Sequence, residues 1–296
     1  MKSGIINVYK EKDYTSSDVV VILKKILQTK KVGHTGTLDP MAEGVLPICV
    51  GKATRLSDYI MDKDKVYEAE IVFGQATDTQ DATGRVTEQN SRIVTQDELQ
   101  AVLSRFLGEI DQIPPMYSAI KKNGKKLYEY AREGIVLERP PRKITIYSME
   151  ILKQKAPNVF LLRICCSKGT YIRVLCVDIA AALGTCGHMA ALLRTACADF
   201  NLNGAFTIDK IRAMKDAENW SFLQPMDSAV LRFVRADVLP EYIEPFFHGR
   251  PIPIGKFVSA DLTKGQKVRV YAGNEFCAMA EFNGAELKTC CMLRDT

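Results

Sequence analysis

The sequence has few of the residues that build metal sites. It contains three His, scattered along 296 residues, and nine Cys with no Cys-x-x-Cys pair. Two cysteine pairs, Cys165-Cys166 and Cys290-Cys291, are directly adjacent, a spacing that suits neither ordinary disulfides nor zinc sites. We therefore expect no metal and no disulfide framework.

Long apolar runs are also missing. The first residues, Met1–Asn7, contain no extended apolar segment like that of a signal peptide, and no run approaches the length that crosses a bilayer. Free cysteines are typical of a reducing compartment. We therefore expect a cytoplasmic protein with no membrane partner.

Charge of one sign is not in large excess. Lys and Arg number 40 against 35 Asp and Glu, which gives a net charge of +5. This balance is compatible with a nucleic-acid partner and does not require one. The basic residues gather beside turns, as in Lys121-Lys122 and Lys125-Lys126. One such cluster is usually just a solvated surface. Several clusters together make binding of a polyanionic partner as good an interpretation as a solvated surface.

What the sequence does have is a turn-rich stretch, Gly33–Arg55. Its first half holds Gly and Pro residues that favour turns, and its second half, Val45–Val50, is a short apolar run typical of a buried strand. Loops that feed core strands often carry chemistry, and Asp39 lies in this one, five residues after His34. Asp before Pro is also a common turn starter, so a structural role for Asp39 stays open, as does a hydrogen-bonded loop role for His34.

The same stretch does not fit a phosphate-binding loop. Between Gly44 and Gly51-Lys52 there are six residues where the Walker pattern has four, and Ala53 replaces the required Ser or Thr. We therefore reject a nucleotide-binding loop here.

Residues 33–54 instead carry a long, ungapped pattern. Positions 33–40 read Gly-His-Thr-Gly-Thr-Leu-Asp-Pro, and Gly44, Leu46, Pro47 and a Gly-x-Ala-Thr tail follow. This pattern resembles the signature of TruB-type tRNA pseudouridine synthases. In that family the Asp is the essential catalytic carboxylate, so the resemblance implies that Asp39 is catalytic. It also implies the α+β pseudouridine synthase fold, with a mixed, mostly antiparallel central sheet flanked by helices.

Periodicity predicts the elements around this loop. Strands are expected over 4–10, 45–50, 65–74, 143–153, 159–168 and 187–200, and helices over 18–28, 52–61, 96–107 and 127–133. Ser16 or Ser17 can cap the first of these helices. Thr95 and Glu98 form a capping box before the third.

Tyr67 and Leu192 have two interpretations each. Tyr67 leads the alternating apolar face of the strand over 65–74, which favours a core aromatic residue, and Leu192 is likewise consistent with core. In the resembling family the matching Tyr stacks on the target base and the matching Leu contacts the bound uridine. The resemblance therefore implies that both residues bind substrate.

Ser167–Arg173 leads into a helix whose apolar stripe leaves out Tyr171 and Arg173. An Arg in such a place is most often part of a surface ion pair. The resemblance implies instead that Arg173 pairs with Asp39, whose ionised form a nearby cation favours, and that Tyr171 lies under the target base. His34 would fill or flank the gap that this base leaves in the RNA.

Two further motifs resemble the family. Residues 75–84 match its Thr-Asp-x-x-Asp-x-x-Gly turn, in which Asp78 and Asp81 are expected to bond the backbone rather than a metal. Residues 112–132 match its Gln-x-Pro-Pro-x-Tyr-Ser-Ala-x-Lys segment and the Tyr-x-x-Ala-Arg that follows. In the family this region belongs to an insertion, about 75–142 here, that closes over the RNA like a thumb.

Basic side chains are the expected contacts with the RNA backbone. Lys121, Lys125 and Lys126 lie in the turn of the thumb and would grip phosphates without reading sequence. Lys10 is a fourth candidate, retained from the family's Lys-Pro-x-Gly-x-Thr-Ser motif. Glu and Asp at positions 11 and 13 replace the Pro and Gly of that motif, which puts the shape of its turn in question.

The chain is expected to divide into two domains. The catalytic domain would cover 1–228, including the thumb. Residues 229–296 contain short alternating stretches and Gly turns, which predict a small β-rich module. Its position resembles that of the PUA-type RNA-binding domain that follows many TruB catalytic domains.

The activity that the resemblance implies is isomerisation of uridine 55 in the T-loop of tRNA to pseudouridine, with flipping of the base. Asp39 would attack the ribose C1′ or take the 2′ proton, and the sequence does not choose between these routes. No redox change occurs, so no cofactor is expected. The partner would be the T-stem and loop of tRNA, bound by a monomer.

Three other functions stay open. One is an RNA-binding protein or tRNA chaperone of the same fold that acts mainly by binding, and another is a pseudouridine synthase with a different RNA target. The third is a carboxylate-dependent hydrolase or phosphotransferase, which would need clusters of metal ligands that the sequence lacks.

Overall fold

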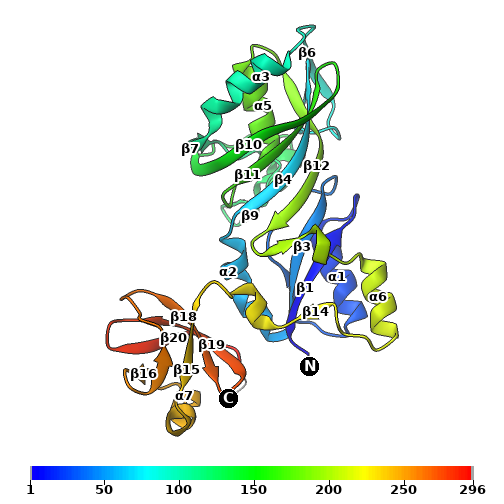
Figure 1. The fold of residues 1–296 in the computed structure, drawn as a ribbon. Coiled ribbons are helices and arrows are strands. Elements are labelled where there is room, and N and C mark those ends of the chain that lie inside the picture. The colour runs from blue at the N-terminus through cyan, green and yellow to red at the C-terminus, as the bar shows by residue number, and fades with distance from the viewer. Residues whose placement is uncertain (1, 295–296) are drawn as a thin grey trace.

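A ten-stranded sheet forms the body of the molecule (Figure 1). The computed structural model describes residues 2–294. The strands run in the order β14 (Leu223–Gln224), β1 (Gly4–Lys10), β3 (Glu43–Val50), β12 (Gly187–Cys197), β4 (Lys65–Phe73), β11 (Val159–Cys166), β10 (Arg142–Ala156) and β7 (Gly108–Gln112), with β2 (Val32–His34) beside β3 and β13 (Phe200–Asn201) beside β12. Only β3 and β12 pair in parallel, so the predicted mixed, mostly antiparallel sheet is confirmed.

Helices cover one face of this sheet. In Figure 1, α1 (Ser16–Ile26) and α6 (Ile208–Asp216) lie beside β1 and β3, whereas α3 (Gln96–Leu103) and α5 (Ile172–Ala182) lie beside β10 and β12. Side chains from all four helices enter one hydrophobic core with the sheet. No helix within residues 2–294 is long and apolar enough to span a bilayer.

Shorter elements connect these layers. They are η1 (Gly51–Leu56), α2 (Ser57–Met61), η2 (Ser104–Phe106), α4 (Leu127–Arg132), η3 (Leu202–Gly204) and η4 (Met226–Ala229), with the small hairpins β5 (Gln75–Thr77)–β6 (Val86–Gln89) and β8 (Lys121–Lys122)–β9 (Lys125–Lys126). Both hairpins belong to the predicted thumb, and the second one is the predicted basic turn.

A separate six-stranded sheet forms the C-terminal part. Its order is β16 (Ile252–Pro253), β20 (Glu286–Met292), β19 (Glu275–Phe282), β18 (Lys267–Ala272), β15 (Val234–Val238) and β17 (Phe257–Ser259), with η5 (Pro240–Tyr242) and α7 (Ile243–Phe247) beside it. The predicted β-rich module is therefore present. Figure 1 shows it as a compact unit attached near α2 and β1.

Strand β1 shows how the two parts meet. Ile6 and Val8 face the core under the helices, whereas Ile5, on the opposite face, packs in a second core. That second core also contains Phe276 and Met279 of the C-terminal sheet. A strand covered on both faces is apolar almost throughout, which is why this segment does not alternate.

The first helix begins earlier than predicted. Thr15, rather than Ser16 or Ser17, is the N-cap of α1, because its side chain accepts from the Asp18 N while the Asp18 carboxylate accepts from the Thr15 N. The helix ends at Ile26, two residues before the predicted end. The predicted capping box of Thr95 is confirmed at the start of α3.

Three predicted elements are composite. The segments expected as helices over 52–61 and 96–107 each contain a 3-10 turn, η1 before α2 and η2 after α3. The strand expected over 187–200 is interrupted between β12 and β13, where Ala198 adopts a φ of 53° and turns the chain.

Candidate active site

Asp39 lies in the loop between β2 and β3, and the residues before it are anchored. The backbone N and the Oγ1 of Thr35 both donate to the carbonyl of Pro47, at 3.1 and 3.0 Å. The Ser16 hydroxyl accepts from the Leu38 N at 2.9 Å and donates to the Leu38 carbonyl at 3.3 Å. A loop fixed at these points presents the Asp39 carboxylate in one position.

Lys10 anchors the loop after Asp39 and is turned away from solvent. It is 0% exposed, and its Nζ donates to the carbonyls of Glu11, Tyr14 and Pro40 at 3.0, 2.6 and 3.1 Å. Burial lowers the pKa of Lys10 to about 8. The expected contact of Lys10 with RNA phosphates is therefore wrong for this structure, because the ammonium is already enclosed by backbone carbonyls.

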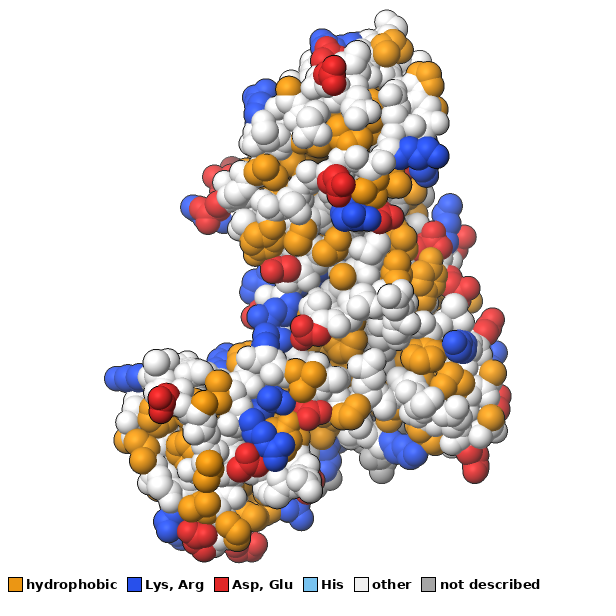
Figure 2. All heavy atoms as spheres, viewed as in Figure 1, with side chains coloured by type: hydrophobic (Ala, Val, Ile, Leu, Met, Phe, Trp, Pro, Cys, Tyr) orange, Lys and Arg blue, Asp and Glu red, His pale blue; other side chains and the backbone are white. Residues whose placement is uncertain are grey.

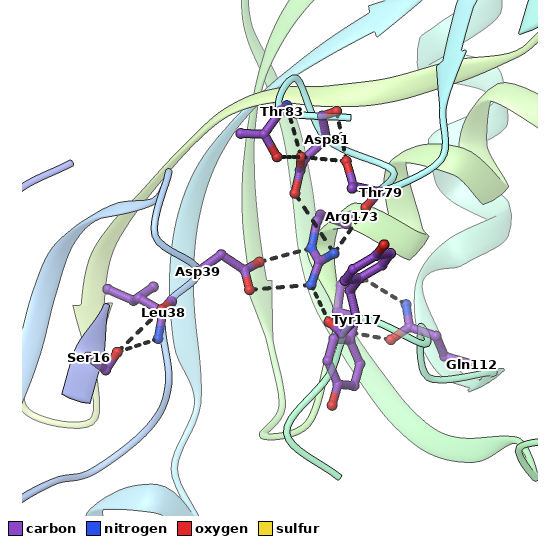
Figure 3. Close-up of polar contacts among 10 residues, drawn as sticks. Ser16, Leu38, Asp39, Thr79, Asp81, Thr83, Gln112, Tyr117 and Arg173 are labelled. Atoms are coloured by element: carbon purple, nitrogen blue, oxygen red, sulfur yellow. Dashed lines mark hydrogen bonds and ion pairs between the residues drawn. The ribbon is translucent and has the colours of Figure 1, made fainter. Parts of the chain in front are cut away.

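Arg173 lies in the first turn of α5 and points at Asp39 across the site (Figure 3). Its Nε lies 2.9 Å from Asp39 Oδ2, and its Nη2 donates to Asp39 Oδ1 at 3.3 Å. Such two-point contact fixes the planes of both groups. The Arg173 side chain is 4% exposed and that of Asp39 34%, so the pair is enclosed on the arginine side and open on the carboxylate side.

Arg173 joins three parts of the chain at one point. Its Nη1 donates to the carbonyl of Thr79 at 3.0 Å, and its Nη2 donates to the carbonyl of Tyr117 in the thumb at 2.8 Å. Asp81 Oδ2 lies 3.8 Å from Nη1. Figure 3 shows these groups arranged around the guanidinium, which thus faces two carboxylates and two carbonyls.

The turn over 75–84 is shaped as predicted. Asp81 Oδ1 accepts from the N and Oγ1 of Thr83, at 3.0 and 2.6 Å, and from the Thr79 Oγ1 at 2.7 Å. Asp78 Oδ1 accepts from the Arg85 N at 2.9 Å. In the described part of the chain, residues 2–294, no three His, Cys, Asp or Glu are grouped to hold a metal.

Asp39 is subject to opposing electrostatic effects. Burial raises the pKa of its carboxyl above the ordinary value, Arg173 opposes that rise, and Asp81 adds to it. From the sequence we expected Arg173 to dominate and to keep Asp39 ionised. Desolvation is the larger effect, and the net direction is upward.

A cavity of about 290 Å³ opens beside the Asp39–Arg173 pair. This volume is near the lower end of the usual range for ligand pockets, about 300–1,000 Å³. The predicted residues Tyr67, Tyr171 and Leu192 all line it. The structure therefore brings five of the predicted site residues together at one cavity.

The three lining residues come from different elements. Tyr67 of β4 and Leu192 of β12 are each 8% exposed, so they are both core residues and part of the cavity wall. Burial raises the pKa of Tyr67 to about 12, so its hydroxyl is protonated at neutral pH. Gln112 holds the backbone of Tyr171 at both ends, accepting from its N at 2.8 Å and donating to its carbonyl at 3.1 Å.

His34 lies outside the residues that line the cavity. Its ring is half-buried at the end of β2, where Nδ1 accepts from the Gly36 N at 3.4 Å. Burial and the nearby Arg194 charge lower the pKa of His34. A neutral ring that supports the Gly36 turn fits the interpretation of His34 as a hydrogen-bonded loop residue. It also fits the interpretation of His34 as a residue beside the RNA.

The three thumb lysines differ in their surroundings. Lys121 is exposed and begins the β8–β9 hairpin. Lys125 forms an ion pair with Glu133 and lies 4.8 Å from the centre of the Tyr130 ring. The Nζ of Lys126 lies 5.4 Å from the centre of the Tyr128 ring. Lys121 is thus the freest of the three to reach a phosphate.

Arg194 is a site residue that the sequence reasoning missed. It lies in β12, lines the cavity and is 1% exposed. The available signal was its position two residues after Leu192, on the same inward face of an apolar strand. Gly44 is explained by the same residue, because a Cβ there would lie 2.3 Å from the Arg194 carbonyl oxygen.

Comparison with protein families gives two matches. Residues 24–172 match the N-terminal domain of TruB family pseudouridylate synthases, and residues 173–231 match the C-terminal domain of tRNA pseudouridylate synthase B. The two matches meet at Arg173, so both carry parts of the site.

Curated relatives cover most of the chain. A tRNA pseudouridine synthase B from Listeria monocytogenes serotype 4b (strain F2365) is 46% identical over 265 residues, which cover 88% of this chain and 87% of the relative. Proteins of the same name from Alkaliphilus oremlandii (strain OhILAs) and Ralstonia nicotianae (strain ATCC BAA-1114 / GMI1000) are 44% and 40% identical. They cover 93% and 96% of this chain, and 91% and 92% of their own lengths.

Solved structures share the fold. The crystal structure of a Cbf5-Nop10-Gar1 complex contains a chain that is 27% identical, with a TM-score of 0.76 over 98% of this chain and 85% of that one. A chain in an H/ACA RNP bound to a substrate RNA containing 2′-deoxyuridine is 24% identical, with a TM-score of 0.76 over 99% and 85%. The predicted pseudouridine synthase fold is thereby confirmed.

The predicted family is confirmed as well, since both the family matches and the relatives span the loop of Asp39 and the helix of Arg173. The chain belongs to the TruB family of pseudouridylate synthases, and it is an isomerase.

Proposed function

We propose that the protein isomerises uridine 55 in the T-loop of tRNA to pseudouridine. The observation that carries this proposal is the half-open Asp39 carboxylate, which faces the cavity while Arg173 holds it in a two-point pair. The names of the curated relatives support tRNA as the substrate. The resemblance of the catalytic loop supports position 55.

The reaction exchanges one bond to the ribose for another. The C1′–N1 bond breaks and uracil departs with the bonding electrons, while the Asp39 carboxylate either bonds to C1′ or removes the 2′ proton. The uracil then turns and C5 bonds to C1′, while the Asp39 carboxylate leaves C1′ in the first route or returns the 2′ proton to C2′ in the second. Finally C5 loses its proton and N1 gains one, so atoms and electrons balance without a redox group. Arg173 keeps Asp39 oriented throughout.

The target base has to leave its stack before it can react, at a cost of a few kcal/mol. Tyr67 and Tyr171 line the cavity and would offset this cost by stacking, which contributes about 1–3 kcal/mol per base. Leu192 offers the base an apolar contact. His34, outside the cavity, would flank the gap that the base leaves in the RNA.

We assign residues 1–228 to the catalytic domain, with the thumb at about 75–142, and residues 229–296 to a PUA-like RNA-binding domain. All strands of the six-stranded sheet lie within 234–292, which supports this boundary. On the face drawn in Figure 2, Lys and Arg side chains gather at the angle between the two domains. The protein would act as a cytoplasmic monomer. It would bind the T-stem and loop of tRNA through these basic side chains and through Lys121, Lys125 and Lys126 of the thumb.

The first experiment measures tritium release from tRNA labelled with 5-³H-uridine. We expect Asp39→Asn to abolish release while tRNA binding persists, because the amide neither attacks C1′ nor accepts the 2′ proton. We also expect Tyr67→Leu to lose activity. Asp178→Asn is the matched control, since this carboxylate is on the helix of Arg173 and does not line the cavity. Ordinary turnover by Asp39→Asn would refute the catalytic assignment.

The second experiment maps pseudouridine in RNA from cells with and without the protein. We expect position 55 of tRNA to lose its pseudouridine when the protein is absent. A site lost in another RNA instead would redirect the proposal to that target. Unchanged maps together with tight tRNA binding would identify a protein that acts by binding alone.

A further inference from the structure

Arg194 is a buried cation in the wall of the cavity. It pairs in register with Tyr67 of the neighbouring strand and is 1% exposed. Its Nε donates to the carbonyl of Val45 at 2.7 Å, and its Nη2 donates to the carbonyl of Gly36 at 3.3 Å. These bonds tie β12 to β3 and to the loop of Asp39, and the guanidinium still borders the cavity.

In the described part of the chain, this charge has no carboxylate partner. Among residues 2–294, no Asp or Glu lies within ion-pair distance of Arg194. Lys65, buried in the same wall, adds a second cation, and its Nζ donates to the carbonyls of Met61, at 2.6 Å, and Lys63. Removing a charge from water without a counter-charge costs several kcal/mol. A buried arginine without a carboxylate partner therefore indicates a functional role for its charge.

Arg173 is different in this respect. It faces the carboxylates of Asp39 and Asp81, so its charge is already balanced within the protein. The part of the cavity lined by Arg194 and Lys65 therefore carries an excess of positive charge. An anion that forms inside the cavity is attracted by the charges of Arg194 and Lys65.

The reaction forms such an anion. In both routes open to Asp39, uracil leaves C1′ with the bonding electron pair and holds negative charge until C5 bonds to C1′. We propose that Arg194 supplies the counter-charge for the departing uracil, an inference that rests on the proposed function. Preorganised donors in a water-poor site are the usual means of stabilising charge that develops in a transition state.

Tyr67 lines the cavity beside this charge, since the two residues pair across β4 and β12. Burial raises the pKa of its hydroxyl to about 12, so the hydroxyl is protonated at neutral pH. A protonated hydroxyl in the cavity wall can donate to a uracil oxygen while Arg194 supplies the positive charge beside it.

The test compares two leaving groups in single-turnover reactions. Fluorine at C5 withdraws electrons and stabilises the uracil anion on its own, so 5-fluorouridine at the target position needs less help from the protein. We expect Arg194→Gln to slow consumption of uridine by about 10²–10³-fold, the loss typical of one removed oxyanion donor. We expect the same variant to slow consumption of 5-fluorouridine by a factor about tenfold smaller.

Two more variants separate charge from shape. Arg194→Lys keeps the charge and should retain part of the uridine rate, and it carries the test alone if the Gln variant does not fold. Arg163→Gln is the matched control, because it removes the same charge from an exposed arginine on β11 that pairs with Glu68 and Glu150. It should leave both rates unchanged.

The outcomes distinguish this inference from the proposed function. Equal slowing of both substrates by Arg194→Gln would mean that the residue only supports the fold, and would overturn the inference. Unchanged rates would overturn it as well. If the unaltered protein fails to convert uridine 55, the proposed function itself falls. Filter binding of tRNA and thermal unfolding, measured for every variant, check that binding and folding are intact.

Discussion

Opposing effects set the pKa of the Asp39 carboxyl. Burial and the negative charge of Asp81 raise this pKa, whereas Arg173 and Lys10 lower it, and the net direction is upward. The reaction needs the ionised form, so activity should fall as the pH falls through this raised pKa. The acidic limb should therefore lie above the ordinary range of an Asp.

Removing the charge of Asp81 should move that limb. We expect Asp81→Asn to shift it to lower pH, because the lost negative charge no longer favours protonation of Asp39. The measurement is kcat/KM for tRNA against pH, which reports groups of the free enzyme. Asp178→Asn changes a carboxylate that does not line the cavity, and it should leave the acidic limb of the pH profile unchanged. If the acidic limb of Asp81→Asn also lies at the original pH, Asp39 is not the titrating group.

At the residue scale, the sequence predicted identities better than environments. The loop pattern singled out Asp39, and the resemblance supplied Arg173 as its partner, a pair that the structure contains. Lys10 was chosen as an RNA contact because it is retained from a family motif, whereas here the carbonyls of Glu11, Tyr14 and Pro40 enclose its ammonium. Contacts between residues 134 or 149 positions apart, such as those of Arg173 and Arg194, depend on the sheet topology and leave no local pattern.

At the scale of elements, the start of α1 serves two tasks with two adjacent residues. Thr15 caps the helix, and Ser16 holds Leu38 in the catalytic loop. We expect Thr15→Ala to destabilise the protein by about 1 kcal/mol while turnover stays unchanged. We expect Ser16→Ala to lower turnover by about tenfold to a hundredfold, because the loop of Asp39 loses an anchor. Thermal unfolding and single-turnover rates measure the two effects, and equal turnover in both variants would contradict this division.

The thumb hairpin allows a similar separation. Lys121 is exposed, whereas Lys125 is engaged with Glu133. We expect Lys121→Ala to weaken tRNA binding and to reduce the salt dependence of binding by about one phosphate contact. Binding constants at several salt concentrations provide the measurement. Lys155→Ala is the control, because it removes a lysine of β10 that pairs with Glu70 of β4, and it should keep the original slope.

Element boundaries were predictable where the local signal was strong. The alternation over 65–74 gave β4 and its buried face, and the capping box of Thr95 gave α3. The cap of α1 was assigned one residue too late because Thr15, Ser16 and Ser17 are all capping residue types. The capping box of Thr15 with Asp18 selects Thr15 as the cap, and Ser16 is engaged with Leu38 instead.

At the scale of the whole molecule, the ten-stranded sheet is covered on both faces near β1. The helices cover one face, and the C-terminal sheet packs against the other. Tyr271 of the C-terminal sheet also donates to Asp227 Oδ2 at 2.6 Å. The sequence predicted a β-rich module here and could not reveal how it packs, because the pattern around Ile5 shows only that this residue is apolar. The angle between the domains in Figure 2 is therefore set by a shared core.

A shared core should make the two domains unfold together. Met279 is 0% exposed in β19 and packs in the core that also contains Val45 and Cys49 of β3. We expect Met279→Ala to destabilise the protein by about 2–5 kcal/mol and to increase hydrogen exchange by similar factors in peptides from β3 and β19. Val258→Ala, at a position 61% exposed in the same domain, should change neither. If exchange rose only in β19, the domains would be independent units, and the shared core would not fix the angle at which the C-terminal domain meets the tRNA.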